Sequence, residues 1–124
     1  MKKAIALLLA LVMVFALCAC GGDKGTADNG EKVVKIGVFE PASGDSGAGG
    51  KKEMLGMQYA NQETPTVEIG GETYKVELVY SDNGSDSAKA VSAASKLVNE
   101  KVSIVLGSYG SGVSIAASDT FKQA

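Results

Sequence analysis

The chain is predicted to fold as an α/β domain with a parallel, doubly wound sheet. Three observations predict this fold. Strand-like and helix-like segments alternate along residues 33–124, short apolar runs resemble strands, and Gly/Ser-rich loops follow two of these runs. Such alternation is typical of parallel strands joined by right-handed helical crossovers.

The first strand is expected at residues 33–39, which are mostly β-branched or aromatic. The glycines and serines of residues 40–50 predict a loop. Residues 51–63 have a helical period, and Pro65 disfavours its continuation. The apolar residues that recur at helical spacing are Met54, Met57 and Ala60, with Leu55 and Tyr59.

Residues 67–80 are expected to form a hairpin that turns at Gly70 and Gly71. The second strand of this hairpin, residues 73–80, largely alternates apolar and charged side chains. This alternation is typical of a strand exposed on one face, near a sheet edge. A polar turn follows, and Asp86 or Ser87 is expected to cap the next helix.

The last helices and strand are predicted by their apolar patterns. Residues 102–106 form a near-continuous apolar run, typical of a central strand covered on both faces. Another helix is expected at residues 113–121. The helix before residues 102–106 has an apolar stripe made by Val91, Ala94 and Val98, flanked by Ala90 and Leu97.

The three parallel strands are expected in the spatial order second, first, third. In this order the chain reverses its direction across the sheet between the first and third strands. The crevice at the carboxyl ends of those two strands is the usual ligand site of such a fold. The loops at residues 40–50 and 107–112 border this crevice.

The composition excludes several classes of function. The 124 residues have a net charge of −2 and contain no histidine, arginine or tryptophan. Histidine-dependent triads and histidine metal sites are therefore excluded within this segment. A mildly acidic chain without arginine argues against nucleic-acid binding. No cofactor is expected.

Residues 1–19 are expected to be a signal peptide. Lys2 and Lys3 precede an uncharged apolar stretch that ends at the small residue Ala19. The alternative is a membrane-spanning helix. A membrane-spanning helix is disfavoured because the run is near the lower end of the about 17–25 residues that such a helix needs. In addition, no positive cluster follows the run.

Residues 17–20, Leu-Cys-Ala-Cys, resemble a bacterial lipoprotein signal. The resemblance implies that Cys20 is lipidated and becomes the new N-terminus. A structural disulfide and a cysteine nucleophile are then both unexpected, because cleavage removes Cys18. Residues 20–32 are expected to be the lipidated cysteine and a flexible tether, since residues 21–31 contain no large apolar residue.

Two familiar motifs are absent from the Gly/Ser-rich loops. A P-loop would need glycine where the chain has Asp45 and a hydroxyl residue where it has Lys52. The dinucleotide fingerprint also fails on glycine spacing. Residues 112–116 begin like a nucleophile elbow but end in Ala116, and no histidine exists here to activate Ser114.

Residues 107–112 are the candidate anion site. This loop presents Tyr109, Gly110 and Ser111 immediately before a helix. Free amides and the positive dipole end at a helix start bind anions, and the Ser111 hydroxyl can donate a hydrogen bond. An amino-acid carboxylate fits this chemistry. The alternative is that Ser111 is only the helix N-cap.

Four stretches resemble the N-terminal part of type I periplasmic binding proteins, the leucine/isoleucine/valine-binding group of ABC importers. Their order and spacing carry the resemblance, which extends from residue 33 to the end of the chain. The stretches are residues 35–41 with Ser43 and Gly44, residues 56–61, residues 79–83 with Asp86, and residues 105–111 with residues 117–119.

The resemblance implies a two-lobed, hinged receptor that closes on a small ligand, with Ser111 holding the α-carboxylate. The ligand would be an amino acid of the branched-chain type or a related small amide. Relatives often carry an aromatic residue at the position of Gly49 that packs on the ligand. The glycine weakens the case for a branched aliphatic ligand, and Ser43 and Ser46 would line a more polar cleft.

The resemblance also implies partners and a location. The partners are ABC permease and ATPase subunits, and the protein is exported and lipid-anchored to the outer face of the bacterial cytoplasmic membrane. Since family members have several hundred residues, residues 33–124 are expected to be an incomplete N-terminal lobe whose third strand has an unpaired edge. The alternatives are a ligand-sensing receptor without transport and a secreted α/β enzyme with catalytic residues outside this segment.

Overall fold

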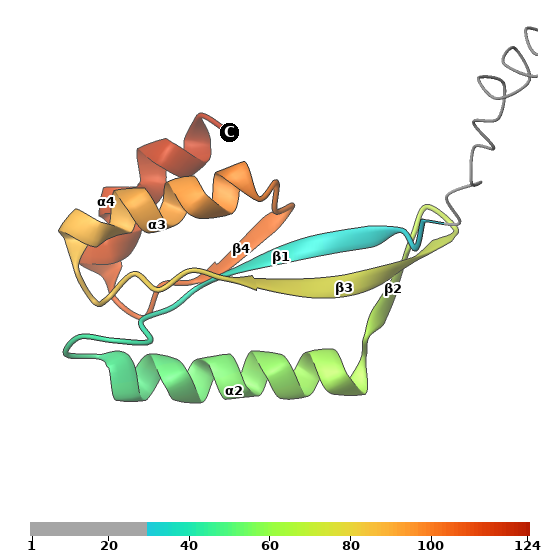
Figure 1. Ribbon diagram of the computed structural model, residues 1–124, viewed down its shortest axis with the longest axis horizontal. Coiled ribbons are helices and arrows are strands. Elements are labelled where there is room, and N and C mark those ends of the chain that lie inside the picture. The colour runs from blue at the N-terminus through green and yellow to red at the C-terminus, as the bar shows by residue number, and fades with distance from the viewer. Residues whose placement is uncertain (1–29) are drawn as a thin grey trace, which may run out of the picture. The chain divides into compact units, whose positions relative to one another are not determined.

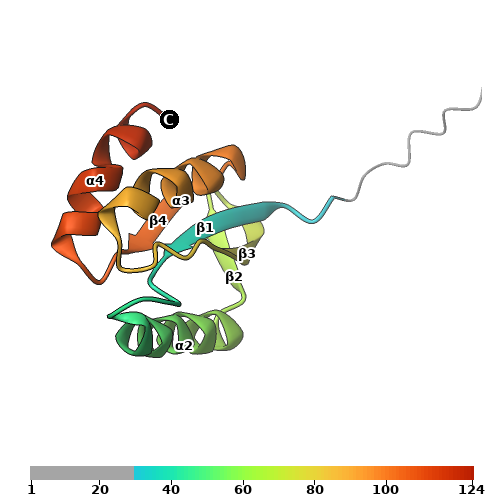
Figure 2. The ribbon, with the colours of Figure 1, turned by 60° about the vertical axis from the view of Figure 1, so that its left-hand side comes forward.

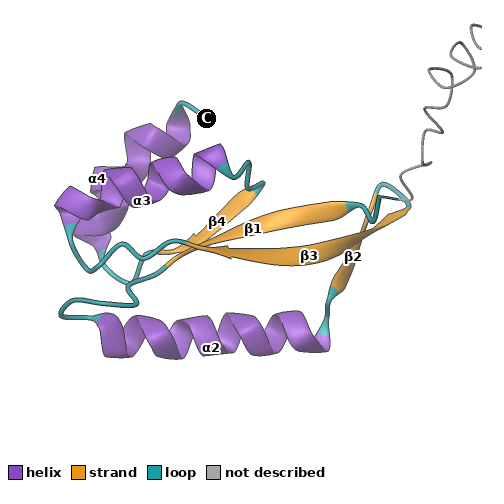
Figure 3. Ribbon diagram, in the orientation of Figure 1, coloured by secondary structure: helices purple, strands orange, loops and turns teal. Residues whose placement is uncertain are grey.

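The computed structural model describes residues 30–124. The predicted signal peptide, the lipidation of Cys20 and most of the tether lie outside these residues. Within them, no helix is both long and apolar enough to cross a membrane. The elements are β1 (Val33–Phe39), α2 (Gly47–Glu63), β2 (Thr66–Ile69), β3 (Glu72–Tyr80), α3 (Ser87–Asn99), β4 (Ile104–Gly107) and α4 (Ser111–Lys122) (Figures 1 and 3).

The four strands form one sheet in the order β2-β3-β1-β4. β1 is parallel to both of its neighbours, so that Val38 lies opposite Tyr80 of β3 and Leu106 of β4. β2 is the antiparallel partner of β3 in the predicted hairpin. The predicted order of the three parallel strands is therefore confirmed.

The helices cover both faces of the sheet. α2 lies on one face, whereas α3 and α4 lie together on the other, and the strands run between these two layers (Figures 1 and 2). The connection from β1 to the hairpin thus crosses one face, and the connection from β3 to β4 crosses the other. This is the doubly wound α/β arrangement that the alternating segments predict.

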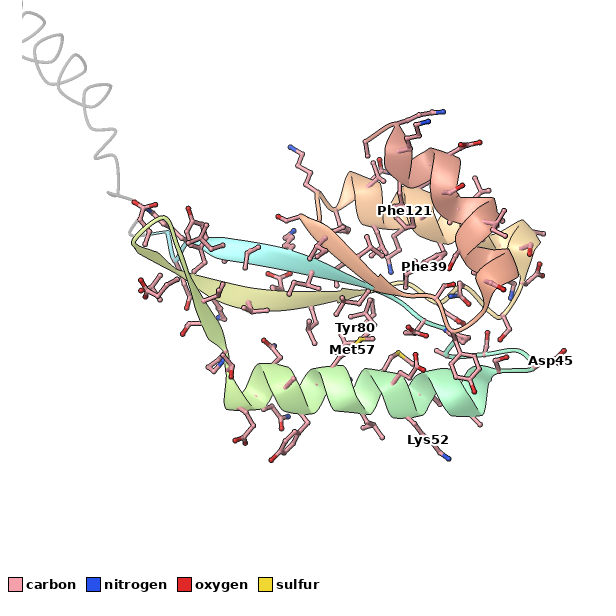
Figure 4. All side chains as sticks on the ribbon, turned by 180° about the vertical axis from the view of Figure 1, so that it is seen from behind. Phe39, Asp45, Lys52, Met57, Tyr80 and Phe121 are labelled. Atoms are coloured by element: carbon pink, nitrogen blue, oxygen red, sulfur yellow. The ribbon has the colours of Figure 1, made fainter. Side chains whose placement is uncertain are left out.

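The tightly packed core lies on the face covered by α3 and α4. Alanines on the inner side of α3 allow close approach to the sheet, and a Cβ at Gly37 of β1 would lie only 3.1 Å from the Leu97 side chain. Phe39 meets Phe121 edge to face, with ring centroids 5.4 Å apart (Figure 4). The buried residues of this core are Phe39, Ala90, Ala93, Ala94, Leu97, Val113 and Ala117.

The opposite face of the sheet is packed more loosely. The helix predicted at residues 51–63 is present, but it begins at Gly47, so that residues 47–50 of the predicted loop are helical. Its apolar residues are not a buried stripe, since Leu55 is 63% exposed and Tyr59 is 65% exposed. Met57 points toward the sheet while Lys52 points away from it (Figure 4). A largely apolar cavity of about 780 Å³ remains between α2 and the sheet. The periodicity thus predicts the helix but not its burial.

The predicted start of β4 and the predicted cap of α3 need correction or refinement. β4 begins at Ile104 rather than residue 102, because Val102 still belongs to the turn after α3, where its N–H donates to the Leu97 carbonyl at 3.4 Å. β4 is also an edge strand of the described sheet, and Ile104 is 55% exposed. In the described residues, β4 is therefore not covered on both faces as predicted. Its outer edge is unpaired, as the prediction of an incomplete lobe implies. Asp86, not Ser87, caps α3 by accepting a hydrogen bond from the Ala88 N–H.

Asn83 connects the carboxyl ends of the central strands. Its side chain is completely buried, and its Nδ2 donates to the carbonyl oxygens of Phe39 at 2.9 Å and Ser108 at 3.2 Å. Its Oδ1 accepts from the Ser85 N–H at 3.0 Å. One side chain from the loop after β3 thus bonds the residues at the ends of β1 and β4.

The substitution Asn83→Ala is expected to lower the free energy of unfolding of the intact protein by about 2–4 kcal/mol, because it leaves two buried carbonyls without a donor. Urea unfolding measures the change. Asn99→Ala, at the exposed end of α3, is the matched control and should change stability by less than about 0.5 kcal/mol. Equal effects of the two substitutions would contradict the role given to Asn83.

Candidate functional site

A hollow of about 490 Å³ lies at the carboxyl end of the sheet. It is bordered by the loop between β4 and α4, by the first residue after β1 and by one side of α2. This is the crevice between the first and third parallel strands that the predicted topology indicates. The bordering residues are Glu40, Glu53, Met57, Leu106, Gly107, Ser108, Tyr109, Gly110, Ser111 and Ser114.

The N-terminus of α4 opens onto this hollow. Gly110 is the N-cap residue, no side chain caps the helix, and the Gly110 carbonyl accepts from Val113 and Ser114 at 3.1 Å. The N–H groups of Ser111 and Gly112 precede the first intrahelical hydrogen bonds. The alternative in which Ser111 is the N-cap is therefore wrong, and its exposed hydroxyl lies beside free amides at the positive end of the helix dipole.

The turn before α4 is fixed by hydroxyl hydrogen bonds. Ser108 is buried, and its Oγ donates to the Gly110 carbonyl at 2.8 Å and lies 2.7 Å from the Ser114 Oγ. Ser114, which the sequence indicates only as a helix residue, thus connects the first turn of α4 to the preceding loop. These bonds keep the Gly110 and Ser111 backbone in place at the edge of the hollow.

The ring of Tyr109 stands directly over Gly49 of α2. A Cβ at position 49 would lie 2.5 Å from Cζ and 2.7 Å from Cε2 of Tyr109. Only glycine fits at position 49 while the ring keeps this place. Tyr109 itself has a φ of +67°, a left-handed conformation that is uncommon for a bulky side chain. An aromatic ring is therefore present near Gly49, although it belongs to the loop between β4 and α4.

Asp82 holds the loop after β1. Its carboxylate accepts hydrogen bonds from the N–H of Ala42 at 2.7 Å, the N–H and hydroxyl of Ser43 at 3.2 and 2.6 Å, and the N–H of Gly84 at 2.9 Å. Burial by itself would raise the pKa of Asp82, but the hydrogen bond from the Ser43 hydroxyl and those from the three N–H groups together lower it to about 2.

The predicted site residues are only partly brought together. Tyr109, Gly110 and Ser111 border one hollow. Ser46 is not among the residues that border it; Ser46 precedes α2, and its N–H donates to the Ser85 hydroxyl at 3.0 Å. The Ser43 hydroxyl is engaged by Asp82. In the described residues, no group of three or more acidic, histidine or cysteine side chains is placed to hold a metal ion.

Glu40 is a residue of the hollow to which sequence reasoning gives no role. Its side chain is only 2% exposed. Burial raises the pKa of Glu40 to about 7, with further contributions from the charge of Glu53 and a hydrogen bond with that carboxyl group. Its one sequence signal is a charged residue directly after a strongly apolar strand.

Comparison with known proteins gives consistent matches. A family model described as "Periplasmic binding protein" matches residues 33–124. The Leu/Ile/Val-binding protein homolog 2 of Brucella abortus is 33% identical over 112 residues, which are 90% of this chain and 28% of that protein. The chain therefore spans little more than a quarter of the length of this relative.

Solved structures show the same partial coverage. The leucine binding protein LivK of Thermotoga maritima matches with a TM-score of 0.65 and 34% identity, over 73% of this chain and 25% of that one. LivJ of Streptococcus pneumoniae, solved with isoleucine, matches with a TM-score of 0.64 and 33% identity, over 74% of this chain and 26% of that one. A Rhodopseudomonas palustris solute binding protein in complex with benzoate matches with a TM-score of 0.63 and 25% identity, over 73% of this chain and 25% of that one.

The contribution of Asp82 to stability is expected to depend on pH. Because its folded pKa of about 2 lies below the usual value of about 3.9, its stabilisation is present above about pH 4 and is lost as the pH falls toward 2. Urea unfolding should therefore show a difference between wild type and Asp82→Asn that shrinks over this range. Asp45→Asn, at the exposed tip of the neighbouring loop (Figure 4), is the control. A difference for Asp82→Asn that is constant with pH would refute the assignment.

Gly49→Ala is expected to displace the Tyr109 ring, because the new methyl group would overlap the end of that ring. The ring resonance of Tyr109 should shift in NMR spectra of protein with labelled tyrosine, while those of the other tyrosines stay in place. Gly56→Ala is the matched control in the same helix, because a Cβ at Gly56 meets nothing within 4 Å. An unchanged Tyr109 resonance in Gly49→Ala would disprove the contact.

Proposed function

Because the chain belongs to the periplasmic binding protein family, we propose that it forms part of the extracytoplasmic solute-binding component of an ABC importer for amino acids or related small molecules. Its function is ligand binding rather than catalysis. The observation that carries the proposal is the hollow at the carboxyl ends of β1 and β4, with Ser111 and the N-terminus of α4 at its edge.

The chemistry of this edge favours a carboxylate. Free N–H groups and the positive dipole end attract an anion, and the Ser111 hydroxyl adds a directional hydrogen bond. Met57 and Leu106 provide apolar surface in the same hollow. A small molecule with a carboxylate and a short apolar part therefore fits the bordering residues better than a phosphate or a sugar.

The names of the matched proteins support the same ligand class. One is described as a Leu/Ile/Val-binding protein homolog, one was solved with isoleucine, and one was solved with benzoate. Isoleucine and benzoate differ in size and charge but share a carboxylate. We therefore place the carboxylate of the ligand at Ser111 and leave the selection of its side chain to other residues.

Binding is proposed to be coupled to transport by domain closure. Since the chain covers about a quarter of its relatives, the second wall of the site would come from the remainder of the protein. Ligand bound at the hollow would favour the closed form, and that form would dock on the permease and ATPase subunits. The signal peptide at residues 1–19 would direct export, and lipid on Cys20 would anchor the protein through the tether at residues 20–32.

Ser111→Ala is expected to weaken binding of a carboxylate ligand by the intact protein by roughly 1–3 kcal/mol, because one hydrogen bond to a charged group is lost. Calorimetric titration with the twenty common amino acids and benzoate measures this change. Ser118→Ala, on the same helix but with its hydroxyl bonded to the Ile115 carbonyl, is the control. Unchanged affinity in Ser111→Ala would remove Ser111 from the site, and absence of binding by every probe would overturn the proposed function.

A further inference from the structure

The loop after β3 contains the sequence Asn83-Gly84. Asparagine is among the thermolabile residues of proteins, and it is most reactive before glycine, where no side chain hinders the main-chain nitrogen that attacks its amide. This reaction, deamidation, needs water but no enzyme and no cofactor. The pair lies at the point where the loop connects the ends of β1 and β4.

The fold needs both members of the pair. The Asn83 side chain is completely buried and donates to the carbonyl oxygens of Phe39 and Ser108. Gly84 has a φ of +64°, a left-handed conformation that favours glycine, and a Cβ there would lie 2.9 Å from Cδ of Lys89. A substitution at either position therefore loses hydrogen bonds or strains the backbone, so the reactive sequence is a consequence of the loop geometry.

The folded loop keeps both reacting groups engaged with other partners. Besides its two donor bonds, the Asn83 amide accepts from the Ser85 N–H at 3.0 Å. The Gly84 N–H, whose nitrogen would attack, donates to the Asp82 carboxylate at 2.9 Å. Because the pKa of Asp82 is lowered to about 2, its carboxylate is a weak base for that proton. Water is excluded as well, since the Asn83 side chain has no exposed area.

We propose that Asn83-Gly84 is a latent deamidation site, which the fold protects and which reacts when the loop after β3 opens. The Gly84 nitrogen then attacks Cγ of Asn83. A bond forms between these two atoms, the bond from Cγ to Nδ2 breaks, and the proton of the Gly84 N–H leaves with Nδ2 as part of ammonia. Water hydrolyses the resulting cyclic imide at either of its carbonyl groups, which leaves aspartate or isoaspartate at position 83.

The product cannot make the contacts of Asn83. A carboxylate has no N–H to donate, and its charge would face the carbonyl oxygens of Phe39 and Ser108. A buried charge without a partner is strongly unfavourable. Isoaspartate also carries the main chain through the former side chain, which displaces the residues that follow, including the α3 cap Asp86. Deamidation would therefore release, irreversibly, the segments after β1 and β4 that border the hollow.

The rate of deamidation measures how often the loop opens. The intact protein is incubated in mildly alkaline buffer and digested with trypsin, and mass spectrometry quantifies the modified form of residues 76–89, which lie between Lys75 and the next lysine, Lys89. The reference is the same peptide, released first and incubated in the same buffer. The folded protein should be modified at least about 10-fold more slowly than the peptide, because several hydrogen bonds must break before the loop opens.

Asp82→Ala tests whether the loop controls this rate. The substitution removes the acceptor of the Gly84 N–H and the hydrogen bonds to Ala42 and Ser43, so the folded variant should be modified several-fold faster than wild type. Each protein is compared with its own tryptic peptide, which corrects for the changed sequence. Asp45→Ala, at the exposed tip of the neighbouring loop, is the matched control and should be modified at the wild-type rate.

The modified wild-type protein tests the consequence. Anion-exchange chromatography separates it by its additional negative charge, and the tryptic digest identifies the fraction changed at position 83. This fraction should unfold at a lower urea concentration than unmodified protein. Asn83→Asp should reproduce the shift, whereas Asn99→Asp, at the exposed end of α3, should not. Equal rates in folded protein and peptide, an unchanged rate in Asp82→Ala, or equal stability of modified and unmodified protein would each overturn the proposal.

Discussion

The loop after β3 fixes the ends of the other two parallel strands, and the hollow depends on this connection. The amide of Asn83 can reach the carbonyls of Phe39 and Ser108 together because β1 lies between β3 and β4 in the sheet. Its neighbour Asp82 orders the loop after β1 through hydrogen bonds to Ala42 and Ser43. Neither Asn83 nor Asp82 borders the hollow, yet together they position two of the segments that do.

Much of the fold could be predicted from the sequence because its signals are local. Apolar runs and helical periods mark the elements, and the contrast between an edge-like and a central-like strand predicts the order that the sheet has. The burial of α2 and the start of β4 could not be predicted in this way. Val102 resembles a strand residue, but whether it pairs depends on how the turn at Lys101, with a φ of +57°, directs the chain.

The site was predictable to the extent that it follows from topology. The loop with Tyr109, Gly110 and Ser111 comes directly after a strand at the switch point, so its place follows from the strand order. Glu40 and Asn83 were not predictable, because a polar residue after a strand is usually a solvated loop residue. Their burial depends on residues from other elements: Glu53 of α2 lies beside Glu40, and the Ser108 carbonyl that Asn83 contacts is 25 positions away.

The contact between Tyr109 and Gly49 fixes an aromatic ring close to the N-terminus of α4. The ring and the Ser111 hydroxyl belong to residues two positions apart, and the turn between them is fixed by the Ser108 hydroxyl. The spacing between the ring and Ser111 is therefore set by the covalent chain and would survive a shift of α2. Positions 49 and 109 also share one volume, so a larger residue at one position requires a smaller one at the other, and the two are expected to change as a pair in related chains.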